Sequence, residues 1–117
     1  MLYLVHGGGD TDVSWPGVGA AGLIMDNLMA EGKMVPMVVV MPNGSIEMPD
    51  GNMMGEVPVF AEDMVKSIIP FIEDNYRVHT DQANRAMAGL SIRNTSLTKH
   101  YAPQKAMVIF ISPWLFQ

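Results

Sequence analysis

A serine at the tip of a predicted strand-to-helix turn is the most reactive feature of the sequence. Gly89-Leu90-Ser91-Ile92-Arg93 matches four of the five positions of the pattern G-x-S-x-G. In that pattern a strained turn exposes the serine hydroxyl for nucleophilic attack and aims a helix N-terminus at the reaction site. Arg93 stands where the pattern has a small residue, so an ordinary helix N-cap is the alternative interpretation of Ser91.

A run of three glycines follows the first apolar segment of the chain. His6-Gly7-Gly8-Gly9-Asp10 comes directly after Leu2–Val5. Without side chains in the way, backbone N–H groups can point into a cavity, which is what an oxyanion hole requires. The alternative interpretation is a flexible glycine turn with no chemical role. A strand before the run and a serine turn later in the chain favour the oxyanion interpretation.

Apolar segments that alternate with helical patterns must position these two motifs. The predicted buried strands are residues 2–5, 37–41, 85–88 and 106–111. Three helices are predicted. The first begins at Ser14-Trp15-Pro16, has its body over 18–31 and stops at Gly32. The second runs over 60–76 with a kink at Pro70, and the third follows Ser91. This order predicts an α/β fold with a parallel sheet covered by helices on both faces. Function in such folds lies at the carboxyl ends of the strands, at 6–12, 42–45, 89–93 and 112–114.

Composition excludes several classes of protein. The chain has 117 residues, of which 49% are hydrophobic and 16% charged, so it is long and apolar enough for one domain with a core. Its net charge of -5 argues against nucleic acid or an anionic membrane as the main partner. Because there is no Cys, thiol catalysis and Cys-ligated zinc are excluded. The longest apolar run, 34–41, is far shorter than the roughly 20 residues of a membrane span.

Two further patterns resemble sites for a dinucleotide and for a cation. Gly17-Val18-Gly19-Ala20-Ala21-Gly22 matches G-x-G-x-x-G, but it follows Trp15-Pro16 rather than a strand, so dinucleotide binding is not expected. Asp10 and Asp12 are two carboxylates in one loop, which are usually solvated rather than bound to a cation. We therefore expect no cofactor and no metal site.

Several stretches together resemble a known family. They are Leu2-Tyr3-Leu4-Val5-His6-Gly7-Gly8-Gly9-Asp10 with Ser14-Trp15, Ile24–Leu28, Met37–Gly44, Ile69–Glu73, Asn75–Val78 and Asn84–Ser91. The chain resembles the esterase family of α/β-hydrolases that includes feruloyl esterases, acetyl-xylan esterases, esterase D and the enterochelin esterases. The resemblance covers residues 2–91 and is strongest to the feruloyl/xylan branch. It implies a truncated α/β-hydrolase core, with a mostly parallel four-stranded sheet and helices on both faces. The strand at 2–5 is then central, between 37–41 and 85–88, with 106–111 beyond.

The resemblance also implies roles for individual residues. Ser91 matches the family nucleophile, and the N–H of Ile92 with that of Gly8 or Gly9 matches the oxyanion donors. Family members of this kind hydrolyse carboxylic esters through an acyl-enzyme. The expected substrates are small esters or esterified polysaccharide, with feruloyl or acetyl groups on plant polysaccharide.

The chain departs from the family after the serine. Family members have glycines where Arg93 and Asn94 stand, and their triad runs Ser, Asp or Glu, then His along the chain. After Ser91 this sequence has no Asp or Glu, and His100 is its only His. A catalytically inactive fragment or interaction module that lacks the triad Asp and His is therefore the alternative function. His6 is a candidate surrogate base. The alternative role for His6 is a structural hydrogen bond that holds the glycine run.

The remaining expectations concern organisation. Residues 1–117 are predicted to form a single partial α/β-hydrolase domain, the half that carries the nucleophile. The apolar strands at 37–41 and 107–111 would be sheet edges, which favours a homodimer through an exposed edge, or poor solubility. A third possibility is a composite triad completed by a partner chain. The N-terminus has no basic region or cleavage site, so no signal peptide is expected and the chain as it stands is expected in the cytoplasm, although family members are often secreted.

Overall fold

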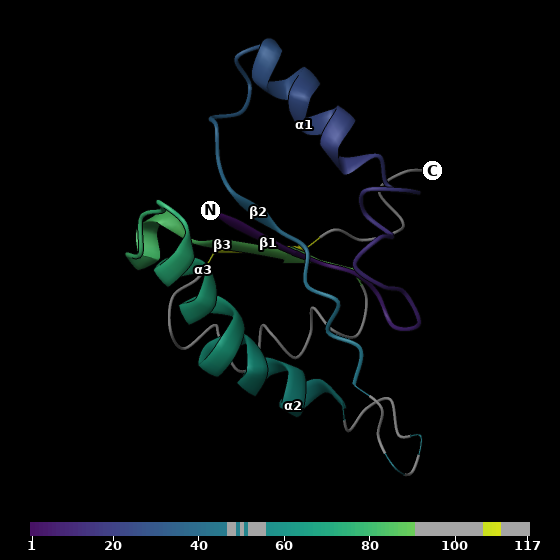
Figure 1. Cartoon of the computed structure of the whole chain (residues 1–117). Coiled ribbons are helices and arrows are strands. Elements are labelled where there is room, and N and C mark those ends of the chain that lie inside the picture. The colour runs from purple at the N-terminus through teal and green to yellow at the C-terminus, as the bar shows by residue number, and fades with distance from the viewer. Residues whose placement is uncertain (47–48, 50, 52–55, 91–106, 111–117) are drawn as a thin grey trace.

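Four short parallel strands form the sheet at the centre of the described chain (Figure 1). A computed structural model describes residues 1–46, 49, 51, 56–90 and 107–110. Its strands are Leu2–Val5 (β1), Val39–Val40 (β2), Ala86–Gly89 (β3) and Met107–Phe110 (β4). The order across the sheet is β2-β1-β3-β4, and every neighbouring pair is parallel. The predicted fold class is thereby confirmed.

The central strand β1 is paired on both sides, with β2 and with β3. It pairs with β3 from Leu2↔Ala86 to Val5↔Gly89. Its pairing with β2 covers only Leu2↔Val39 and Tyr3↔Val40, so β2 is shorter than the five residues predicted for it. Pro42 accounts for the early end of β2, because proline has no N–H for a strand ladder and restricts the residue before it.

Helices lie on both sides of the sheet (Figure 1). Helix α1 spans Ala21–Ala30 on one side. On the other side, helix α2 (Glu56–Asp63) continues through a π-helical turn, Met64–Ile68 (η1), into α3 (Ile69–Asn75). A short 3₁₀ turn, Gln82–Asn84 (η2), then leads into β3. Within the described ranges, no helix is long and apolar enough to cross a membrane.

Helix α1 begins later than Ser14-Trp15-Pro16 predicts. The Ser14 hydroxyl accepts a hydrogen bond from the backbone N–H of Thr11 at 3.2 Å, so it closes a turn instead of capping a helix. Ala20, with φ 47°, then takes the left-handed conformation just before the first helical residue. The predicted helix start was wrong because the Ser14 hydroxyl finds a local partner in the preceding loop, as serine commonly does.

The predicted stop of this helix at Gly32 is confirmed. Gly32 has φ +68°, a conformation that glycine adopts without steric cost. Its N–H donates to the carbonyl of Met29 at 3.0 Å, and the N–H of Lys33 donates to Leu28 at 2.8 Å. These two bonds satisfy carbonyls at the helix end in the arrangement of a Schellman motif.

The break predicted at Pro70 takes the form of the π-helical turn η1. Proline lacks an N–H, and its ring collides with the carbonyl four residues earlier in a regular helix. The wider turn over Met64–Ile68 accommodates this while the chain continues as a helix on both sides. Met64 and Ile72 are buried as their spacing predicts, whereas Phe71 is 59% exposed.

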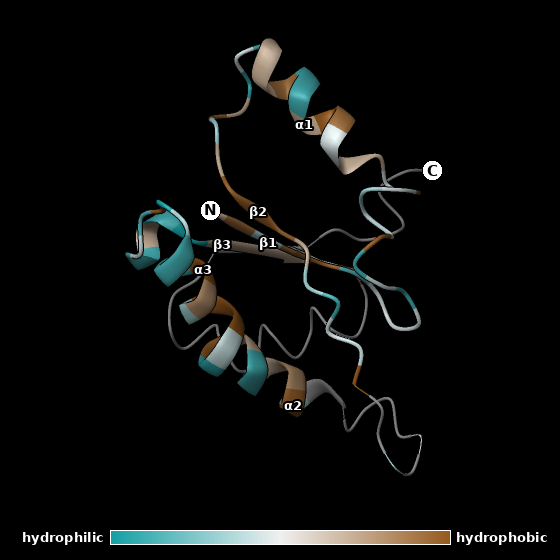
Figure 2. Ribbon diagram, viewed as in Figure 1, coloured by the Kyte–Doolittle hydropathy of each residue, from teal (hydrophilic) through white to brown (hydrophobic). Residues whose placement is uncertain are grey.

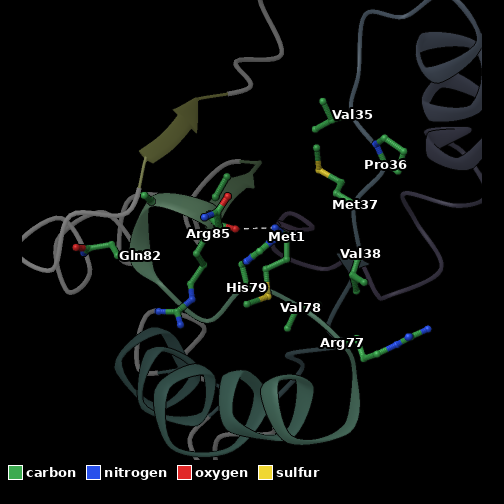
Figure 3. Close-up of a pocket in the computed structure, with 13 residues that line it drawn as sticks. Met1, Val35, Pro36, Met37, Val38, Arg77, Val78, His79, Gln82 and Arg85 are labelled. Atoms are coloured by element: carbon green, nitrogen blue, oxygen red, sulfur yellow. Dashed lines mark hydrogen bonds between the residues drawn. The ribbon is translucent and has the colours of Figure 1, made fainter.

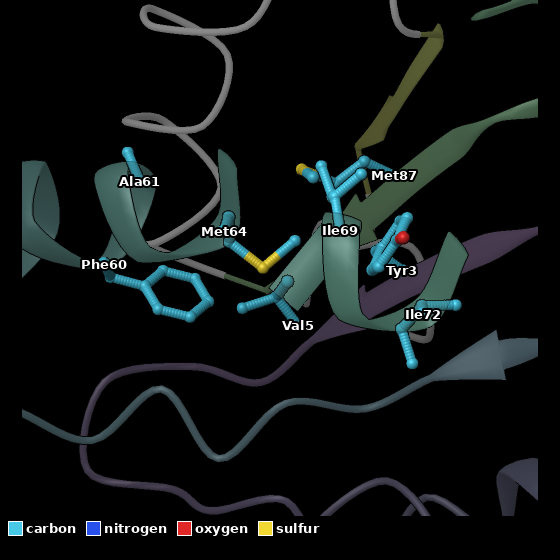
Figure 4. Close-up of a cluster of buried hydrophobic side chains, with 8 residues drawn as sticks. All are labelled: Tyr3, Val5, Phe60, Ala61, Met64, Ile69, Ile72 and Met87. Carbon is cyan, nitrogen blue, oxygen red and sulfur yellow. The ribbon is translucent and has the colours of Figure 1, made fainter. Parts of the chain in front are cut away.

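The larger part of the core lies between the sheet and α2–α3 (Figure 4). Tyr3 and Val5 of β1 and Met87 of β3 face this side, and Figure 2 shows the hydrophobic residues gathered along the strands. The helices contribute Phe60, Ala61, Met64, Ile69 and Ile72. Tyr3 is fully buried, and this burial raises the pKa of its hydroxyl, an effect that Arg85 opposes and Glu73 adds to. Burying such side chains contributes roughly 1.5–3 kcal/mol each.

The opposite face of the sheet has a smaller core. Leu4 of β1 and Ala88 of β3 pack there with Ala21 at the start of α1. Trp15 and Met25 pack against this cluster and remain partly exposed. Neighbouring residues of β1 thus point to opposite faces, and both faces are covered, as the continuous apolar strands predict.

Candidate active site

The carboxyl ends of β1 and β3 bring the two predicted motifs together. Val5 and Gly89, the last residues of these strands, are paired, and the N–H of Leu90 donates to the carbonyl of Val5 at 3.1 Å. Leu90 is the residue immediately before Ser91. The start of the serine turn therefore lies beside the residue that precedes His6. Ser91, Ile92 and the helix predicted after them lie outside the described residues, as do Arg93 and His100.

The glycine run packs against Leu90 through Gly7. A Cβ atom on Gly7 would lie 3.4 Å from Cδ2 of Leu90 and 3.4 Å from Oδ2 of Asp10. The N–H of Asp10 donates to the Gly7 carbonyl at 3.3 Å, which closes the run into a turn. Within it, Gly9 has φ +82°, a left-handed conformation that favours glycine. The glycines thus serve a close approach at Gly7 and a reversal of the chain at Gly9.

The backbone N–H groups of Gly8 and Gly9 have no acceptor among the described residues. Both residues are exposed, unlike the buried Gly7. Exposed N–H groups without an acceptor among the described residues, close to Leu90, have the properties that an oxyanion hole needs. Their predicted role remains a prediction, because the position of Ser91 is not described.

His6 sits beneath the glycine run with both ring nitrogens against main-chain oxygens. The side chain is 1% exposed. Its Nδ1 lies 2.8 Å from the Gly7 carbonyl oxygen, and its Nε2 contacts the carbonyl oxygen of Asn43. A general base needs a nitrogen free to accept a proton from the nucleophile. The observed contacts favour the structural alternative for His6, and its role as a surrogate base stays an untested prediction.

Asn43 connects the loops that follow β1 and β2. Its side-chain Nδ2 donates to Oδ1 of Asp12 at 2.9 Å, and its Oδ1 accepts from the N–H of Ser45 at 3.1 Å. The sequence pattern predicts a functional loop at 42–45 but indicates no role for Asn43. Pro42-Asn43-Gly44, directly after a predicted strand, is a typical turn sequence. In such turns the Asn side chain bonds nearby backbone, which was the sequence feature that could have indicated a role for Asn43.

The site borders a small hollow. Its volume is about 200 Å³, and it is lined by His6, Gly7, Asp10, Trp15 and Leu90 among others. This is smaller than the roughly 300–1,000 Å³ of pockets that enclose drug-sized ligands. The described residues contain no group of three or more His, Asp or Glu side chains placed to hold a metal ion.

A larger hollow lies at the opposite ends of the strands (Figure 3). Its volume is about 790 Å³, and Met1 and Ala86, at the amino ends of β1 and β3, line it. Here the N-terminal amine donates to the Asn84 carbonyl at 2.7 Å. None of the predicted site residues lines this hollow, so its size does not make it the catalytic site.

Sequence comparison identifies a curated relative. No protein-family model matches the chain. The chain is 44% identical over 94 residues to an endo-1,4-beta-xylanase/feruloyl esterase of Xylanibacter ruminicola. The match covers 79% of this chain and 13% of that protein. The chain thus corresponds to a small part of the relative.

Structural comparison also finds ferulic acid esterases. A solved ferulic acid esterase is 30% identical with a TM-score of 0.71, and the match covers 92% of this chain and 42% of that one. A CE1 ferulic acid esterase from Anaeromyces mucronatus, solved with ferulic acid, has a TM-score of 0.76 at 23% identity, over 91% and 42% of the two chains. The chain spans less than half the length of these structures. The resemblance expected from the sequence motifs is confirmed, and so is the α/β-hydrolase fold.

Proposed function

We propose that this chain, a member of the esterase family of α/β-hydrolases by sequence and fold, carries the nucleophile and oxyanion hole of a carboxylic-ester hydrolase. In this proposal residues 1–117 form one partial domain, Ser91 is the nucleophile, and the N–H groups of Gly8, Gly9 and Ile92 are the oxyanion donors. The supporting observation is the packing of Leu90 against Gly7, beside two exposed glycine N–H groups without acceptors in the described part of the chain.

The chemistry follows from these groups. The Ser91 hydroxyl oxygen attacks the ester carbonyl carbon, loses its proton to solvent, and forms a tetrahedral oxyanion that the N–H groups stabilise. Collapse of this intermediate breaks the ester C–O bond, and the alcohol leaves with a proton from solvent. Water then cleaves the acyl-enzyme to release the carboxylic acid. In this scheme the glycine run stabilises negative charge and takes no part in proton transfer.

The substrate class is proposed from the relatives. Relatives named as feruloyl and ferulic acid esterases match the chain, and one of them is also named as a xylanase. These names support feruloyl or acetyl esters of plant polysaccharide as substrates. The substrate part of the proposal is tested by comparing p-nitrophenyl ferulate with p-nitrophenyl acetate.

A second candidate function is an inactive module that keeps the sheet and lacks the triad acid and base. It is favoured by the sequence after Ser91, which has no Asp or Glu, and by the two occupied nitrogens of His6. Without a base, a serine hydroxyl is a weak nucleophile.

Binding and an oxyanion hole alone retain roughly 10³–10⁴-fold catalysis over water in serine proteases. We therefore propose residual hydrolysis for this chain alone.

Hydrolysis of p-nitrophenyl acetate separates the two candidates. We expect the wild-type chain to release p-nitrophenol faster than the Ser91→Ala variant does. Ser67→Ala is the matched control, because Ser67 is an exposed serine on η1, in the helical layer that packs on one face of the sheet. Equal rates for wild type and Ser91→Ala would favour the inactive module.

The outer edge of β2 supports a further proposal, a homodimer. In the described chain β2 pairs only with β1, which leaves its other edge open. Beside this edge Phe71 is 59% exposed and lines a hollow with Val40 and Ile68. An open strand edge next to apolar side chains is a template for pairing with a second chain. A composite triad is a separate proposal, in which a partner chain at this edge supplies the acid and the His.

A further inference from the structure

We propose that Asn43 and Asp12 are positioning residues that hold the glycine run in the geometry required for the reaction. The inference rests on the proposed function, because it gives the run its role as an oxyanion hole. Neither residue touches the reacting atoms. They act through His6 and through the loop that contains Gly8 and Gly9.

The Asn43 side chain is fixed from two directions. Its Nδ2 donates to Asp12 Oδ1 at 2.9 Å, while its Oδ1 accepts from the Ser45 N–H at 3.1 Å. The second bond holds the turn after β2, and the first reaches across to the loop after β1. Both ends of the amide are therefore used, and the direction in which the amide points is defined.

The Asn43 main chain makes the second connection to the same loop. Its carbonyl oxygen contacts Nε2 of His6, whose Nδ1 lies 2.8 Å from the Gly7 carbonyl oxygen. The loop from His6 to Asp12 is thus tied to Asn43 at both of its ends. The contacts at the His6 end are shielded from water, because His6 is 1% exposed.

Gly8 and Gly9 lie between these two attachments and have no side chains of their own to hold them. Glycine has more conformational freedom to lose than any other residue, so a glycine run needs external contacts to stay in one conformation. Asn43 connects this loop to the turn after β2, while Thr11 and Ser14 bond each other at the far end of the loop and Gly7 lies against Leu90. Preorganised donors are what an oxyanion hole requires, so loosening the loop should slow the reaction at Ser91.

Paired substitutions test the inference through the rate at which a fluorophosphonate labels Ser91. We expect Asn43→Ala and Asp12→Ala each to lower this rate about tenfold, less than the roughly 10²–10³-fold loss for removal of an oxyanion donor. The double variant Asn43→Asp with Asp12→Asn exchanges the two side chains and restores an amide–carboxylate pair. It should label within about twofold of wild type, whereas Asn43→Asp alone places two carboxylates together and should label slowly.

Asn84→Ala is the matched control. Asn84 Nδ2 donates to both carboxylate oxygens of Asp81, at 3.0 and 2.9 Å, so it makes an amide–carboxylate contact of the same kind at the other end of the strands. We expect Asn84→Ala to label at the wild-type rate. Urea unfolding of every variant identifies those that label slowly only because they are unfolded.

The amide resonances of Gly8 and Gly9 provide a readout that does not depend on reactivity. They should shift in Asn43→Ala and Asp12→Ala, return in the exchanged double variant, and stay in place in Asn84→Ala. Folded single variants with wild-type glycine resonances, or an exchanged variant that restores neither readout, would overturn the inference. A wild-type chain that resists labelling contradicts the proposed function alone, and the glycine resonances then decide whether the loop is held in this way.

Discussion

The backbone N–H of Leu90 donates to the carbonyl of Val5 at 3.1 Å and extends the pairing of β3 with β1 by one residue. This bond fixes the residue before Ser91 beside the residue before His6. Because the strands are parallel, both loops leave the sheet at the same edge. The two motifs, which lie more than eighty residues apart in the sequence, are therefore neighbours through the register of one strand pair.

Substitution of Gly9 should destabilise the fold although nothing surrounds it. Apart from its two chain neighbours, no described residue has an atom within 4 Å of a Cβ on Gly9, but its φ of +82° is unfavourable for any residue with a side chain. We expect Gly9→Ala to lower the free energy of unfolding by about 1 kcal/mol in urea titrations. Gly22→Ala is the control. Gly22 also has open space around it but lies in α1, so alanine there should stabilise by about 0.5–1 kcal/mol. Equal effects of both substitutions would contradict this account.

Removal of the Tyr3 hydroxyl should stabilise the core. The hydroxyl oxygen is buried and has no hydrogen-bond partner among the described residues. We expect Tyr3→Phe to raise the free energy of unfolding at pH 7 by about 1 kcal/mol. Tyr76→Phe is the control, because Tyr76 is 52% exposed, and it should change little.

The same residue should make stability fall in alkali. Burial raises the pKa of Tyr3 above its ordinary value of 10.0, so the folded chain favours the neutral hydroxyl more than the unfolded chain does. This contribution is fully present below the unfolded pKa and is lost as pH rises through the folded pKa. Urea unfolding at pH 7 and above pH 10 should show a smaller alkaline loss for Tyr3→Phe than for wild type. An unchanged loss would show that Tyr3 does not titrate with unfolding.

Association through the edge of β2 should appear in solution. We expect static light scattering to give a mass that rises with concentration from 12.8 kDa toward twice that value. The exposed apolar side chains beside β2 provide the physical reason. A constant monomer mass up to the highest soluble concentration would exclude the homodimer.

The sequence predicted the sheet better than the loops. Continuous apolar runs such as Leu2–Val5 can be buried in few ways, and the resemblance supplied the strand order that the structure confirms. The start of α1 was predicted wrongly, because local propensity could not show that the Ser14 hydroxyl bonds the Thr11 N–H. Local patterns read one segment at a time, whereas this bond depends on how the preceding loop turns.

The candidate site was likewise predictable from the sequence only in part. The spacing and residue types of the glycine run and the serine turn could be recognised from the sequence alone. The role of Asn43 could not, because its contacts with His6 and Asp12 join segments that are 37 and 31 residues apart. Only the parallel arrangement of β1 and β2 brings those loops together.

Intact-mass measurement after reaction with a fluorophosphonate tests directly whether Ser91 is the nucleophile. In this reaction the Ser91 oxygen forms a bond to phosphorus, fluoride leaves, and the hydroxyl proton passes to solvent. We expect a single adduct on the wild-type chain and on Ser67→Ala, and no adduct on Ser91→Ala. An unmodified wild-type chain, or an equal adduct on Ser91→Ala, would contradict the assignment of Ser91 as the nucleophile.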